Sequence, residues 1–205
     1  MSENPKTKKV LLTLLVFAFV LSSFYILDFK ASQSETQANS GVSAYSSGSP
    51  EINFSGRIHL YIEGDDALTV HLKEKLEENL RAAGMEVIIV DTIEEKYDSQ
   101  ALLVNISRNN WLYTPVYASS NLNLVFFYTS TGKDTKYFEQ FKNGNKTVVF
   151  VNDSSVNGQK LMDGEIKLQD STKGLISLKA YKKHLASEAA KEVVDMLEQN
   201  VRNLP

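Results

Sequence analysis

The sequence predicts an α+β protein: an N-terminal transmembrane helix, then a two-layer αβ sandwich with two long helices on one face of a mixed sheet. Three observations predict this fold. An uncharged apolar run fills residues 10–27, two later segments repeat apolar residues about every four positions, and several short segments have strand-like patterns. Because each amphipathic helix must cover its apolar face, one shared sheet is the economical solution.

The apolar run at residues 10–27 has the length of a membrane span. At ~1.5 Å per residue it reaches roughly 27 Å, close to the hydrocarbon thickness of a bilayer. Lys6, Lys8 and Lys9 precede it and Asp28 follows it. Because lysines stay in the cytoplasm, residues 1–9 should be cytoplasmic and everything after Asp28 should lie outside. The expected location is therefore the cell membrane, with a single pass.

A cleaved signal peptide is the main alternative to this signal anchor. Signal peptides have shorter apolar cores and end in a small-x-small site, whereas Ala31 has the large Phe29 two positions before it. Cleavage further along, near Ala38 or Ala44, stays open, and so does a buried core helix. The chain has no cysteine, which excludes an acylated-cysteine anchor, disulfides and thiolate metal sites.

Composition divides the remainder into two parts. Residues 28–50 are rich in Ser, Gly, Asn and Gln, and they predict a flexible tether. Residues 51–205 are long enough for one extracytoplasmic αβ domain. After residue 27 the chain holds 19 basic and 24 acidic residues, a net charge of −5, which argues against a nucleic-acid partner.

The domain opens with strand, helix and strand. Residues 57–63 alternate as a half-buried strand, and Leu68, Leu72, Leu76 and Leu80 form the stripe of a helix. Asp65 or Asp66 supplies the N-cap and Gly84 ends the helix. Residues 85–90 predict a strand that is buried on both faces.

Later segments complete the sheet. Strands are predicted at residues 101–108, 122–129, 146–152, 165–168 and 175–178, with a turn at 171–174. Residues 135–141 predict a short helix, and 179–201 predict a long amphipathic one. The aromatic-rich segment 125–128 should lie at the sheet centre.

Residues 57–107 resemble small envelope-associated αβ domains. A strand, a long helix ending in Arg81-Ala82-Ala83-Gly84 and the strand Met-Glu-Val-Ile-Ile-Val look like the LptE-like and PelC-like accessory lipoproteins and the N-terminal domain of TolB. The resemblance implies a domain that is held at a membrane and assists a larger complex. The missing lipid-modified cysteine departs from the lipoproteins of that group, and no site residue carries over.

No catalytic or cofactor motif emerges from the sequence, so we expect no enzyme activity, no cofactor and no metal. His59, His71 and His184 lack metal-site spacing and are interpreted as solvated or helix-flank residues. Asp153 and Asp163 are interpreted as loop acids, outside any calcium-loop pattern. Three sequons in an outward-facing domain are candidate glycosylation sites, at Asn145, Asn53 and Asn152.

The segment 109–117 is the most suggestive one for binding. It predicts a loop that carries Trp111, Tyr113 and Tyr117, the residue types that form partner contacts or stack on sugars. The alternative is that Trp111 and Tyr113 fold under the loop and cap the sheet.

Three functions remain open from the sequence. The first is a membrane-anchored extracytoplasmic accessory or protein-interaction domain without catalysis, whose partner is a membrane or envelope protein. The second is an extracytoplasmic binding domain for a small solute or glycan, and the third is an envelope hydrolase.

Overall fold

The computed structural model describes residues 5–47, 55–143 and 159–203. In chain order the elements are α1 (Pro5–Ile26), β1 (Lys30–Ser47), β2 (Gly56–Glu63), α2 (Ala67–Ala82), β3 (Met85–Val90), β4 (Gln100–Thr114), β5 (Tyr117–Thr129), α3 (Tyr137–Lys142), β6 (Gln159–Ile176) and α4 (Leu178–Asn203). The strands form one six-stranded sheet in the order β1-β6-β5-β4-β2-β3. Only β4, β2 and β3 run parallel, so the predicted α+β class with a mixed sheet is confirmed.

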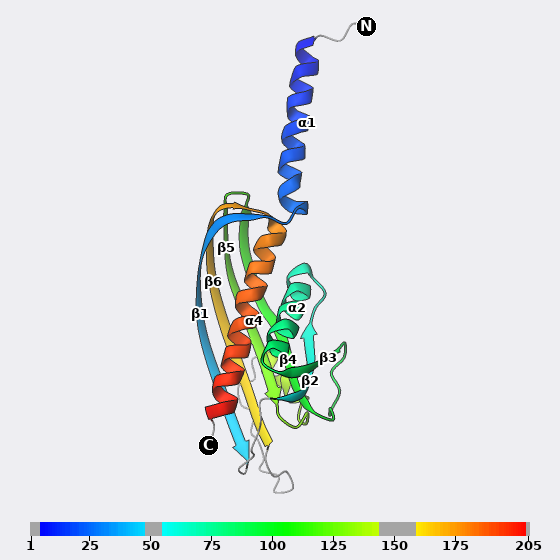
Figure 1. The fold of residues 1–205 in the computed structure, drawn as a ribbon, viewed down its shortest axis with the longest axis vertical. Helices are drawn as coiled ribbons and strands as arrows, with labels where there is room; N and C mark the ends of the chain where they lie inside the picture. The colour runs from blue at the N-terminus through cyan, green and yellow to red at the C-terminus, as the bar shows by residue number, and fades with distance from the viewer. Residues whose placement is uncertain (1–4, 48–54, 144–158, 204–205) are drawn as a thin grey trace.

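Helices α2 and α4 lie together against one face of the sheet (Figure 1). The leucine stripe of α2 and the small residues Ala186, Ala189 and Ala190 of α4 are buried in the same apolar core. Small side chains let the two helices approach closely. We call this the helix-covered face and the other the open face.

The ends of α2 follow the predicted signals. Asp66 is the N-cap, and its carboxylate accepts hydrogen bonds from the backbone N–H groups of Leu68 and Thr69. Gly84 has a φ of 91°, which favours glycine just after a helix. The strand at 125–128 is buried in β5, between β4 and β6, as predicted.

The predicted tether is wrong over most of its length. Residues Lys30–Ser47 form β1, an 18-residue strand at the edge of the sheet. It pairs antiparallel with β6 from Lys30↔Ile176 to Ser47↔Gln159. The backbone ladder and the polar contacts described below order a segment whose side chains bury little apolar surface.

Three other strand predictions are corrected. The two short strands predicted at residues 165–168 and 175–178 are parts of one continuous strand, β6. Gly174 within it has a φ of 112°, a backbone conformation that favours glycine. Strand β3 lies at the sheet edge with a mixed burial pattern, so it is not buried on both faces. The predicted strand at 146–152 lies outside the described residues.

Helix α1 is an apolar rod that projects from one end of the sheet (Figure 1). Lys8–Ile26 is the one stretch in the described residues that is long and apolar enough to cross a membrane, and none of it is buried. Three residues, Leu27 to Phe29, connect α1 to β1.

Candidate functional site

The first candidate surface lies where α1 meets the sheet. Pro115 and Val116 turn β4 into β5, and their carbonyls accept hydrogen bonds from the N–H groups of Ile176 (3.1 Å) and Gly174 (3.0 Å) at the end of β6. Four large apolar side chains stay exposed here, and we call them the hairpin tip: Trp111, Leu112, Val116 and Leu175. The tip extends to the level of the last turn of α1 (Figure 1).

Tyr113 links three elements at this junction. Its hydroxyl lies 3.1 Å from the Phe24 carbonyl of α1 and 2.9 Å from the Ile176 carbonyl of β6. Its ring meets Tyr25 edge-on at 5.6 Å between centroids. Burial, followed by the neighbouring Tyr25, raises the pKa of Tyr113. The phenol therefore stays protonated at neutral pH, and its one O–H is shared between the carbonyls of α1 and β6.

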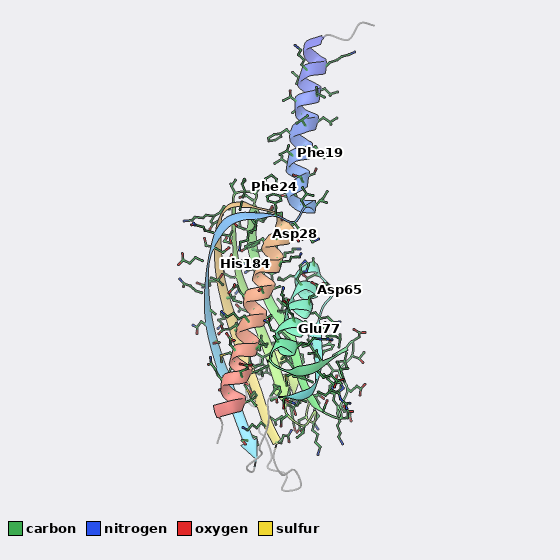
Figure 2. The ribbon with its side chains drawn as sticks, viewed as in Figure 1. Phe19, Phe24, Asp28, Asp65, Glu77 and His184 are labelled. Atoms are coloured by element: carbon green, nitrogen blue, oxygen red, sulfur yellow. The ribbon has the colours of Figure 1, made fainter. Side chains whose placement is uncertain are left out.

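A second set of contacts fixes the connection after α1. The Ser177 hydroxyl accepts hydrogen bonds from the N–H groups of Ala180 and Phe29, and the Phe29 carbonyl accepts one from the Ser177 N–H. Asp28 pairs with Lys183 of α4. Figure 2 shows Phe24 at the last turn of α1 and Asp28 just below it, at this junction. The start of α4 and the end of α1 are therefore tied together rather than loosely linked.

Two of the three predicted contact residues come together. Trp111 and Tyr113 lie 6.5 Å apart between ring centroids, and Lys182 Nζ of α4 lies 5.6 Å from the Trp111 ring. Trp111 is 44% exposed, whereas Tyr113 is half-buried. Tyr117 alternates onto the open face and does not join them.

The predicted loop at 109–117 is wrong in form. Residues up to Thr114 continue β4, and Tyr117 already belongs to β5. The register between β4 and β5 shifts between Ile106 and Arg108, so residues after the bulge change faces. This shift turns Trp111 and Tyr113 toward the helix-covered face. Nothing in the local sequence predicts the bulge.

A buried polar network joins β1, β6 and α4. Asp170 Oδ1 accepts hydrogen bonds from Thr36 (2.7 Å) and His184 Nε2 (2.9 Å), and its Oδ2 accepts one from Thr172 (3.0 Å). Burial raises the pKa of Asp170, but the bonds from His184, Thr36 and Thr172 outweigh burial and leave it below its ordinary value. Both the Thr36 hydroxyl and the Asp170 carboxylate lie within hydrogen-bond distance of His184 Nε2. Because the Thr36 hydroxyl donates its hydrogen to the carboxylate, the imidazole does not activate this hydroxyl as a nucleophile.

The histidines are predicted from the sequence to be solvated or helix-flank residues; His71 and His184 do lie on α2 and α4, but none of the three side chains is largely exposed. The side chains of His59, His71 and His184 are 11%, 14% and 12% exposed. His59 stacks on Tyr97 at 4.6 Å between centroids, and its Nδ1 lies 3.1 Å from the Ser99 hydroxyl. Each histidine thus has a packing or hydrogen-bonding role inside the fold.

The open face holds the second candidate surface, a cavity of about 690 Å³. Strands β1, β5 and β6 form its floor, and Phe141 and Lys142 of α3 flank it. Lys142 Nζ donates a hydrogen bond to each carboxylate oxygen of Glu63, both at 2.9 Å. Asp163 lies in β6 rather than in the predicted loop, and burial raises its pKa despite a hydrogen bond from Ser43.

Several predicted residues receive no placement. Asn53, Asn145, Asn152 and Asp153 lie outside the described residues. Within 5–47, 55–143 and 159–203, no three His, Asp or Glu side chains gather as a metal site.

No protein-family model and no curated protein matches this chain.

Proposed function

We propose that this protein is a single-pass membrane protein whose domain outside the membrane acts by binding a partner, without catalysis. Helix α1 carries the proposal, since its apolar surface is left uncovered by the rest of the described chain. An apolar helix of this length is stable when lipid covers it. The lysines before α1 favour a cytoplasmic N-terminus, which leaves the αβ domain outside.

The outer edge of β1 is the surface that we assign to a protein partner. β1 is the strand at one edge of the sheet. Its outer side pairs with no described strand along its 18 residues. Such an edge presents unpaired N–H and C=O groups, which a strand of another protein satisfies by adding to the sheet. Exposed Gln37 and Asn39 lie midway along this edge.

Site-specific photocrosslinking in native membranes tests the proposal. A photoreactive phenylalanine at Gln37 of the full chain should capture a membrane or envelope protein. The same residue at Glu78, whose side chain is 64% exposed on α2, is the matched control. Equal capture from both positions, or none from Gln37, contradicts the assignment of β1.

The cavity on the open face favours binding of a small solute or glycan as the second function. Its volume suits a small ligand, and the half-buried carboxyl of Asp163 lines it beside Glu165 and Lys167. A panel of soluble oligosaccharides should then raise the unfolding temperature of the full chain in detergent. Asp163→Asn should abolish that rise while Asp91→Asn, at an exposed site, keeps it; no rise with any sugar contradicts a glycan ligand.

A further inference from the structure

We infer that the hairpin tip docks into the headgroup layer of the membrane that α1 crosses, with anionic phospholipid as its preferred contact. The inference rests on the membrane anchor of the proposed function and adds a second membrane-binding surface to it. The domain then contacts the bilayer through the end that carries the hairpin tip.

The short connection after α1 places the tip at the membrane. Only Leu27, Asp28 and Phe29 lie between α1 and β1, and Asp28 and Phe29 are bonded to Lys183 and Ser177. The hydroxyl of Tyr113 reaches the Phe24 carbonyl in the last turn of α1. The end of the span and the hairpin therefore share one level along the long axis of the molecule (Figure 1).

The chemistry of the tip suits the interfacial zone. Among the described residues outside α1 and Leu27, five large apolar side chains are exposed, and four of them form the hairpin tip; the fifth is Val70. Tryptophan and tyrosine favour the headgroup level, where an apolar ring and a polar group are both satisfied. An apolar patch beside the end of a span is covered by lipid without any further partner.

Lysines surround the tip in an otherwise acidic domain. Lys30 begins β1 beside Ile176, Lys173 pairs with Tyr117, and Lys179, Lys182 and Lys183 lie in the first turns of α4. Of these, Lys183 is paired with Asp28. The chain after residue 27 nevertheless holds 24 acidic against 19 basic residues. This concentration of positive charge at one end complements anionic headgroups.

Trp111 is the only tryptophan of the chain, so its fluorescence reports directly on the tip. The full chain is reconstituted in vesicles of phosphatidylcholine and phosphatidylglycerol whose acyl chains carry bromine near the headgroup. We expect blue-shifted emission, loss of most of it to the brominated lipid, and weak quenching by aqueous acrylamide. Vesicles of phosphatidylcholine alone should give less quenching by bromine.

Two variants locate the contact. Val116→Glu places a charge at the turn, where the side chain is 60% exposed, and should restore most of the emission in brominated vesicles. Val70→Glu makes the same change at a 45% exposed site on α2, which begins further from α1 (Figure 1), and should leave the quenching unchanged. Circular dichroism checks that both variants keep the fold.

Resistance to alkaline carbonate separates the two proposals. If the chain resists extraction but Trp111 is quenched by acrylamide and untouched by bromine, docking is wrong and the anchor stands. If carbonate extracts the chain from the vesicles, α1 does not span, and the anchor and the docking surface both fail.

Discussion

At the scale of single residues, Asp170 shows how a buried acid is made stable. Its side chain has no exposed surface, and Thr36, His184 and Thr172 supply its hydrogen bonds. A buried carboxylate without partners is costly, so each of these polar residues stabilises the charge. The network also joins the edge strand β1 to β6 and α4.

The lowered pKa of Asp170 predicts acid sensitivity. A carboxyl whose folded pKa lies below its unfolded value stabilises the fold above about pH 4, and this contribution is lost as pH falls through the folded pKa. Asp170→Asn should lower the stability at pH 7 by about 1–3 kcal/mol and flatten the decline below pH 4. Thermal unfolding of the full chain in detergent from pH 7 to pH 2.5 measures both. An unchanged acid profile beside the exposed-site control Asp91→Asn contradicts the assignment.

The residues of the junction differ in how well the sequence predicts them. Trp111 and Tyr113 stand out by residue type, because aromatic side chains often form partner contacts. Ser177 and Lys182 carry no such signal, since a serine and a lysine near a helix start are common. The bulge after Ile106 decides which face the two aromatic residues take, and it depends on pairing with β5, which local sequence does not specify.

At the scale of elements, periodicity succeeds where apolar burial orders the segment. The leucine stripe of α2 and the four-residue spacing of α4 predict both helices within a few residues of their observed bounds. Periodicity does not reveal β1, because the side chains that it turns to the helix-covered face are small and polar. There Ser34 hydrogen-bonds Thr172, Thr36 hydrogen-bonds Asp170, and Ser40 hydrogen-bonds Glu192. A strand ordered by a backbone ladder and polar contacts has the composition of a linker.

The pairing of β5 and β6 depends on a glycine. Phe126 lies opposite Gly164, and a Cβ at Gly164 would lie 2.3 Å from the Phe126 ring. Gly164→Ala should therefore lower the free energy of unfolding by about 1–3 kcal/mol through overpacking. The matched control is Gly41→Ala in β1, where no atom lies within 4 Å of the new Cβ. Denaturant unfolding that gives equal stabilities for the two variants contradicts the role of this contact.

At the scale of the whole molecule, α1 and the domain form one elongated body whose junction is hydrogen-bonded at Phe24, Phe29 and Ser177. A flexible tether would let the domain change its position relative to α1, whereas this junction fixes that position. In the proposed membrane arrangement, the hairpin tip and the β1 edge each lie at a defined distance from the bilayer that α1 crosses. The side on which the domain lies is then decisive for any partner.

That side is accessible to direct test because the chain has no cysteine of its own. A single cysteine at Glu86, whose side chain is 74% exposed on β3, should react with a membrane-impermeant maleimide on intact cells. A single cysteine at Ser2 should react only after permeabilisation in the proposed orientation, which the lysines of residues 6–9 favour. The reverse pattern would place the domain inside the cell, and reaction of both sites on intact cells would show that α1 does not span the membrane.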